Sequence, residues 1–141
     1  MLRALFLLLA VAQASPVSQG YLVMQPVQEA VRQGNYAALK PICRPRLALD
    51  LEEPFSLRGF LTREQFVERV SIRLANLKTE RFEWSSLQVD ENIAVQSLNL
   101  VLVDRSSGRK VYYKLILFMN ADDDPDEEIK WKLYYLRGLR M

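Results

Sequence analysis

The chain has 141 residues, a formal net charge of +2, one cysteine and no histidine. This charge balance argues against binding to nucleic acid or anionic lipid through bulk charge, because both need basic residues in clear excess. One cysteine excludes an intrachain disulfide, and the lack of histidine removes the commonest metal ligand and the commonest general base.

The first fourteen residues have the pattern of a secretory signal peptide. Arg3 gives a positive start, residues 4–11 are an unbroken apolar run, and Ala12 and Ala14 form a small-x-small cleavage site before Ser15. The run is far shorter than the ~20 apolar residues of a spanning helix. We therefore expect residues 1–14 to be removed and the protein to be exported to the periplasm or the extracellular space, with no membrane segment remaining.

The segment after the leader predicts a flexible start followed by two short helices. Residues 15–22 contain serine, proline and glycine without periodicity, which is typical of a flexible N-terminus. Apolar residues then recur at helical spacing from Val23 until Gly34 ends the helix. Asn35 can cap a second short helix that runs to about Ile42.

The next segment predicts two strands and a longer helix. Leucine alternates with other residues over positions 47–51, the period of a half-buried strand, and residues 57–60 can return beside it. Thr62 and Gln65 have the spacing of a capping box. Apolar residues on one helical face follow, so we expect a helix over residues 63–77.

The rest of the chain predicts a strand meander. The apolar period changes to two, and residues 82–84, 94–103, 110–119 and 129–139 are rich in β-branched and aromatic side chains. Residues 105–109 have the composition of a hairpin loop. Early helices and late strands indicate an α+β fold, in which the N-terminal helices pack in the concave face of a curved antiparallel sheet.

Strand alternation divides the sheet into two faces. The purest apolar sets should face the helices: Phe82, Trp84, Leu98, Leu100, Leu102, Val111, Tyr113, Leu115, Leu117, Met119, Ile129, Trp131, Leu133 and Tyr135. The opposite face also carries an apolar strip of Val101, Val103, Ile116 and Phe118. A contiguous exposed patch of this kind usually marks a partner surface, and we expect it to join two copies of the chain.

The element order resembles the nuclear transport factor 2-like superfamily, a cystatin-like α+β cone. The resemblance rests on residues 27–39, where one helix ends at a small residue and a polar cap starts the next, and on the final meander that includes residues 131–137. It implies one domain over residues 23–141, a conical pocket between helices and sheet, and pairing through the outer sheet face. A leader followed by one such domain is also similar to small exported bacterial proteins of unknown function.

No residues point to a catalytic or metal site. Tyr36, Tyr113, Trp131 and Tyr135 are candidates to line a pocket for a small apolar ligand, although such aromatic residues can equally fill a core. The single cysteine, Cys43, is predicted to be a small, buried apolar residue. The carboxylates of residues 122–128 are adjacent rather than spaced to encircle calcium, which favours a solvated loop. We predict no cofactor and no metal.

Three functions fit these observations. The first is a secreted or periplasmic non-enzymatic domain that binds a small apolar ligand or a protein partner, as a homodimer. The second is a hydro-lyase or isomerase of the ketosteroid isomerase or dehydratase type, with a tyrosine and Asp50 as proton carriers. The third is a structural accessory of a cell-envelope assembly. Two polar groups converging in an open cavity would favour the enzyme.

Overall fold

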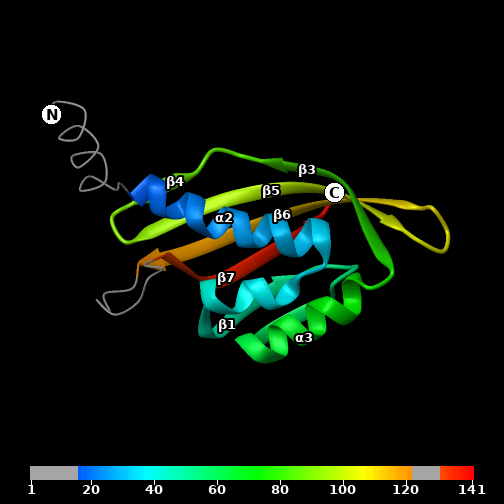
Figure 1. Ribbon diagram of the computed structural model, residues 1–141, viewed down its shortest axis with the longest axis horizontal. Coiled ribbons are helices and arrows are strands. Elements are labelled where there is room, and N and C mark those ends of the chain that lie inside the picture. The colour runs from blue at the N-terminus through cyan, green and yellow to red at the C-terminus, as the bar shows by residue number, and fades with distance from the viewer. Residues whose placement is uncertain (1–15, 122–130) are drawn as a thin grey trace, which may run out of the picture.

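The computed structural model describes residues 16–121 and 131–141. Helices and a strongly curved sheet enclose one core (Figure 1). The elements in chain order are helix α2 (Pro16–Gln33), the 3-10 helix η1 (Tyr36–Ile42), strands β1 (Cys43–Leu51) and β2 (Leu57–Thr62), helix α3 (Arg63–Leu74), and strands β3 (Leu77–Trp84), β4 (Gln88–Asp90), β5 (Ile93–Asp104), β6 (Lys110–Ala121) and β7 (Trp131–Arg140). The expected signal peptide and acidic loop lie outside the described residues.

The sheet has the strand order β2-β1-β7-β6-β5-β3, with β4 paired to β5. Strands β3, β5, β6 and β7 form the expected antiparallel meander. Strand β1, however, pairs with β7 in parallel, so the sheet is mixed rather than purely antiparallel. This pairing joins segments from opposite halves of the chain, and local apolar patterns carry no information about it.

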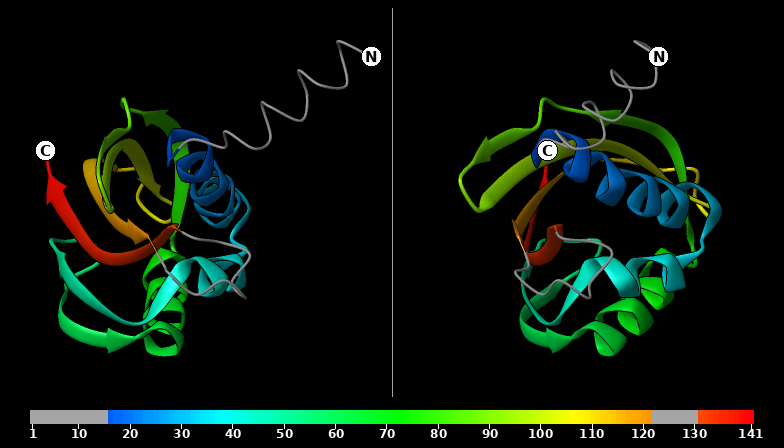
Figure 2. Two further views of the ribbon diagram at one scale, coloured as in Figure 1. Left: turned by 90° about the vertical axis from the view of Figure 1, so that its left-hand side faces the viewer. Right: turned by 60° about the vertical axis from the view of Figure 1, so that its left-hand side comes forward.

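The sheet curls around the helices, which fill its concave side (Figure 2). Buried leucines from β1, β5 and β6 meet the apolar face of α3 and the C-terminal half of α2 in a single core. No helix among residues 16–121 and 131–141 has the length and apolar character needed to cross a membrane.

Helix α2 differs from the prediction at its start and agrees with it at its end. It begins at Pro16, so the segment 16–22 that we expected to be flexible is helical. It ends at Gln33, and the N–H of Gly34 donates to the carbonyl of Ala30 (3.0 Å). Gly34 has a φ of +73°, a conformation that glycine adopts with little steric cost.

Helix α3 begins at the predicted capping box. The N–H of Gln65 donates to Oγ1 of Thr62 (3.2 Å), and the N–H of Thr62 donates to Oε1 of Gln65 (3.1 Å). The helix ends at Leu74, three residues earlier than predicted, because Leu77 already belongs to β3. Leu77 therefore packs on the core from a strand, although its spacing also suits the helix.

The short helix before β1 is a 3-10 helix, and its predicted cap is not formed. The side chain of Asn35 makes no capping hydrogen bond. Its Nδ2 donates instead to Oε1 of Glu29 on the preceding helix (3.0 Å). Asn35 thus links α2 to the start of η1 rather than capping η1.

A bulge in β7 changes which side chains face the core. Met119 of β6 is opposite Leu133, but Phe118 is opposite Tyr135, so Tyr134 is an extra residue in β7. The extra residue reverses the alternation from that point. Leu136 and Gly138 are buried on the inner side, and Tyr135 moves to the outer face.

Candidate functional site

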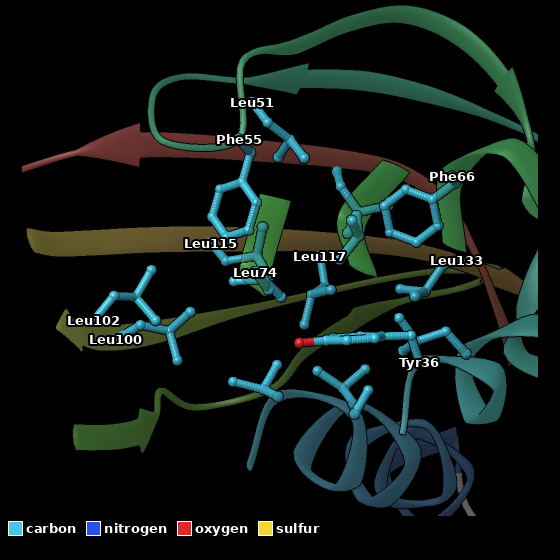
Figure 3. Close-up of a pocket in the computed structure, with 16 residues that line it drawn as sticks. Tyr36, Leu51, Phe55, Phe66, Leu74, Leu100, Leu102, Leu115, Leu117 and Leu133 are labelled. Atoms are coloured by element: carbon cyan, nitrogen blue, oxygen red, sulfur yellow. The ribbon is translucent and has the colours of Figure 1, made fainter. Parts of the chain in front are cut away.

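The helices and the sheet enclose a small apolar cavity of about 50 Å³ (Figure 3). This volume is about a third of the ~150 Å³ engineered cavity that binds benzene in another protein. Every element of the cone except β2, β3 and β4 contributes to its wall. The lining residues are Val27, Ala30, Val31, Tyr36, Leu39, Leu51, Phe55, Phe66, Val70, Leu74, Leu100, Leu102, Leu115, Leu117, Leu133 and Leu136.

Tyr36 is the one predicted ligand-binding residue in this lining. Its ring lies between α2 and the sheet, and its hydroxyl is directed among the leucine side chains (Figure 3). Among the lining side chains, this hydroxyl is the only polar group. Burial raises the pKa of the Tyr36 phenol, and the positive charge of Arg105 partly offsets that effect. The phenol therefore stays protonated at neutral pH.

Tyr113 is a structural part of the core rather than of the cavity wall. It is 1% exposed, and its hydroxyl donates to the backbone carbonyl of Glu52 (3.2 Å). Gly138 makes room for the phenol, because a Cβ at that position would overlap the tyrosine oxygen. Burial, and secondarily the charge of Glu52, raises the pKa of Tyr113.

The other two predicted aromatic residues also lie outside the lining. Trp131 is 2% exposed in the core at the start of β7. The prediction that Tyr135 faces inward is wrong, because the bulge at Tyr134 turns it outward. Its ring stacks on Phe118, with centroids 4.9 Å apart.

The carboxylates that could act as proton carriers are absent from the cavity wall. Asp50 lies on the side of β1 opposite the buried leucines and pairs with Nε of Arg58 (3.3 Å). Oε2 of Glu52 accepts a hydrogen bond from the backbone N–H of Arg140 (2.9 Å). The tyrosine and Asp50 arrangement considered for a hydro-lyase is therefore not formed.

The described residues contain no cluster of three or more side chains suited to hold a metal ion. Cys43 is fully buried, as the sequence predicts. Burial raises the pKa of its thiol to about 12.

The four residues of the predicted apolar strip all lie on the outer face of the sheet, but they do not form one continuous strip, because the polar pair Asn99 and Lys114 separates Val101 from Ile116. Val101, Val103, Ile116 and Phe118 are all half-buried there. Phe118 is the most enclosed by aromatic rings, since Tyr134 packs edge-on against it (6.5 Å) and Tyr135 stacks on it.

Strand register instead places Phe118 in an apolar row that runs across the sheet. Val95 is opposite Phe118, Phe118 is opposite Tyr135, Tyr135 is opposite Ala48, and Ala48 is opposite Phe60. We call these five residues the outer band. The band ends at β2, a sheet edge, where Phe60 is 71% exposed and Arg46 lies over its ring (5.9 Å).

The sequence indicated part of the outer band and only part of the cavity wall. Period-2 alternation gives Val95 and Phe118 the same face, but the roles of Tyr135, Ala48 and Phe60 depend on the bulge and on the parallel β1–β7 pair. Most of the leucines in the cavity wall were predicted to face inward. Nothing in their pattern signals that they leave a space between them.

Comparison with known proteins finds similarity in structure alone. No protein-family model matches the chain, and no curated protein matches its sequence. Among solved structures, a DUF4783 family protein from Bacteroides uniformis has a TM-score of 0.65 at 11% identity, over 83% of this chain and 95% of that one. An NTF2-like protein from Cytophaga hutchinsonii has a TM-score of 0.63 at 10% identity, over 90% and 99%. The S. rosetta CaMKII hub has a TM-score of 0.67 at 16% identity, over 91% and 98%.

These similarities cover most of the chain, and they agree with the fold from which the resemblance was inferred. The chain therefore has the nuclear transport factor 2-like fold, which it shares with proteins of unknown function.

Proposed function

We propose that this protein is an exported, non-catalytic domain that acts by binding protein, with a second copy of itself as the partner. The observation that carries the proposal is the outer band. It crosses the sheet from β5 to β2 without a charged residue, and it is covered by none of the described helices.

The aromatic centre of the band supports a role in binding. Energetically dominant interface residues are commonly large aromatic side chains near the centre of a contact. Phe118, Tyr134 and Tyr135 form such a group, and their mutual ring packing holds them in place before any partner arrives.

The residues beside the band are mostly polar. They can keep the free protein soluble and can fix how two copies align. The next row across the sheet contains Ser97, Ile116, Arg137, Asp50 and Arg58, which is polar at four of its five positions. An apolar centre with a polar surround is the usual anatomy of a specific protein interface. A twofold pairing would place the same band on both copies, which closes the assembly at a dimer.

The interior favours binding over catalysis. The cavity wall holds a single polar side-chain group, Tyr36, and no carboxylate within it can exchange a proton with a ligand. General acid–base work needs a titrating group within about 2.6–3.2 Å of the transferred proton. The fold also serves as a CaMKII hub in S. rosetta, which supports an assembly role for it.

The substitution Phe118→Glu tests the proposal. A charge at the centre of the band should abolish self-association, because a buried unpaired charge costs several kcal/mol. Light scattering coupled to gel filtration should give twice the mass of one chain for the wild type and the mass of one chain for the variant.

Ile72→Glu is the matched control. Ile72 is 65% exposed on α3, away from the sheet, and the same change there should leave the mass unaltered. A wild type that remains monomeric up to roughly millimolar concentration would refute the proposal. Export is tested separately by mass spectrometry of the secreted fraction, which should find Ser15 as the first residue.

A further inference from the structure

The sheet has two edges, and the edge at β3 is protected against pairing with a further strand. The register of β3 with β5 shifts between Thr79 and Arg81, which interrupts the regular row of backbone groups. Every exposed residue of β3 is charged. Helix α2 is also tied to this strand, because Oγ1 of Thr79 donates to the carbonyl of Val31 (3.1 Å) and Arg32 lies over the Phe82 ring (5.0 Å). Bulges, charges and covering elements are the usual means of keeping an edge strand unpaired.

The edge at β2 is less protected. Its register with β1 is continuous from Arg46 opposite Thr62 to Leu51 opposite Leu57. Among the described strands, β1 alone pairs with β2. In an antiparallel edge strand, every second residue directs its N–H and C=O away from the neighbouring strand. The free side of β2 therefore offers backbone donors and acceptors to a further strand.

The side chains of β2 leave room for such a strand. The exposed residues are Arg58, Gly59 and Phe60, in the middle of the strand. A Cβ on Gly59 would meet no atom within 4 Å, and the φ of +102° at this position disfavours any residue with a side chain. A glycine inside a strand often marks a place where another backbone approaches closely. The middle of β2 is thus open, with an aromatic ring beside the opening.

The charges of this edge decide which partner fits it. Two of its arginines, Arg58 and Arg63, are each paired with a carboxylate (3.3 and 3.2 Å). No described carboxylate pairs with the third, Arg46, whose guanidinium lies over the Phe60 ring (5.9 Å). A second copy of β2 would bring the same excess of positive charge, and like charges across a strand pair are destabilising. A segment with a carboxylate side chain is complementary to this edge.

We propose that the free side of β2 binds an extended segment of another protein by strand addition, and that a carboxylate side chain of that segment pairs with Arg46. The added strand lies beside β2, in the plane of the sheet, whereas the second copy of the proposed function lies over the outer face. Phe60 is at the corner of the two surfaces and contacts side chains of the added segment. The inference is therefore independent of self-association through the outer band.

Titration with a synthetic peptide tests the proposal. The probe alternates valine and threonine around one central glutamate and has acetyl and amide ends, and the control probe has lysine at the centre. Amide NMR shifts of β2 should saturate with the glutamate peptide at roughly millimolar concentration, and the lysine peptide should bind about fivefold more weakly. Methylating the backbone nitrogens along one side of the glutamate peptide should abolish binding, and methylating those along the other side should not, because an added strand pairs through one side only.

Three variants test the residues of the edge. Arg46→Gln should weaken binding of the glutamate peptide about threefold and should not weaken binding of the lysine peptide. Phe60→Ala should weaken binding of both peptides about threefold, because it removes the ring that the added side chains contact. Arg81→Gln is the matched control at an exposed arginine of the β3 edge, and it should have no effect.

The same titration on Phe118→Glu separates strand addition from assembly through the outer band. The peptide affinity should be the same in this variant and in the wild type, whatever the mass of either protein. Absence of saturable shifts up to roughly 10 mM peptide, or equal binding of the two methylated peptides, would overturn the proposal. Self-association that protects the β2 amides in the absence of peptide would also overturn it, because a second copy would then occupy the edge.

Discussion

The two faces of the sheet differ in composition and in role. The inner face is apolar and mostly buried, and Tyr113 fits into it with a hydrogen-bond partner and a glycine that leaves room for its ring. The outer face alternates an apolar band with charged and polar rows, and its aromatic side chains stay partly or largely exposed. The inner face therefore stabilises the monomer, whereas the outer face has spare apolar surface that a partner can cover.

Leu117 and Phe118 are adjacent in β6 but lie on opposite faces, so substitutions at these two positions test the difference between the faces most directly. Leu117→Ala removes a side chain that is 1% exposed in the core and should reduce the free energy of unfolding by about 3 kcal/mol at any protein concentration. Phe118→Ala should reduce the free energy of unfolding of the isolated monomer by less than Leu117→Ala does. Because it weakens association, it should also make the apparent stability independent of protein concentration. Urea denaturation at two protein concentrations measures both effects. Equal costs for the two variants would show that the faces do not differ.

The contact between β6 and β7 can be broken through a single glycine. Gly138→Ala should destabilise the protein by about 2 kcal/mol, because the new methyl group overlaps the Tyr113 phenol and displaces its hydrogen bond to Glu52. The double variant with Tyr113→Leu should be less destabilised than the sum of the single changes. Additive costs in that cycle would contradict the contact.

The loss of stability at alkaline pH tests whether the Cys43 thiol is buried. The folded thiol holds its proton up to about pH 12, above the ordinary value of 9.0, so its contribution to stability is complete below pH 9 and is lost as the pH rises through the folded pKa. The free energy of unfolding should fall by about 1 kcal/mol more between about pH 8 and pH 10 in the wild type than in Cys43→Ala. Parallel pH profiles for the two proteins would place the thiol in solvent.

The smallest effect is expected at a charged pair of the outer face. Asp50→Asn removes the ion pair with Arg58, whose side chain is 74% exposed, and should change the free energy of unfolding by less than about 0.5 kcal/mol. Thermal unfolding at low and high salt measures it. A loss comparable to that of a core substitution would mean that this row of the sheet is buried in an interface.

Much of the fold was predictable because its signals are local. The capping box of Thr62, the stop at Gly34 and the alternation of β5 and β6 depend on residues a few positions apart, and the structure confirms them. Of the candidate site residues, Tyr36 lines the cavity and Phe118 lies on the outer face as predicted. The placement of Tyr135 was wrong, because one extra residue in β7 reverses its alternation without changing the sequence pattern on which the prediction rests.

The sequence by itself therefore determined the class of fold, the end of α2, the start of α3 and the faces of its regular strands, since each of these follows from short-range spacing and turn chemistry. Only the tertiary structure decided the parallel pairing of β1 with β7, the continuity of the outer band and the presence of an unfilled space behind Tyr36. These features arise where distant segments meet, and their register and packing depend on all of the segments at once.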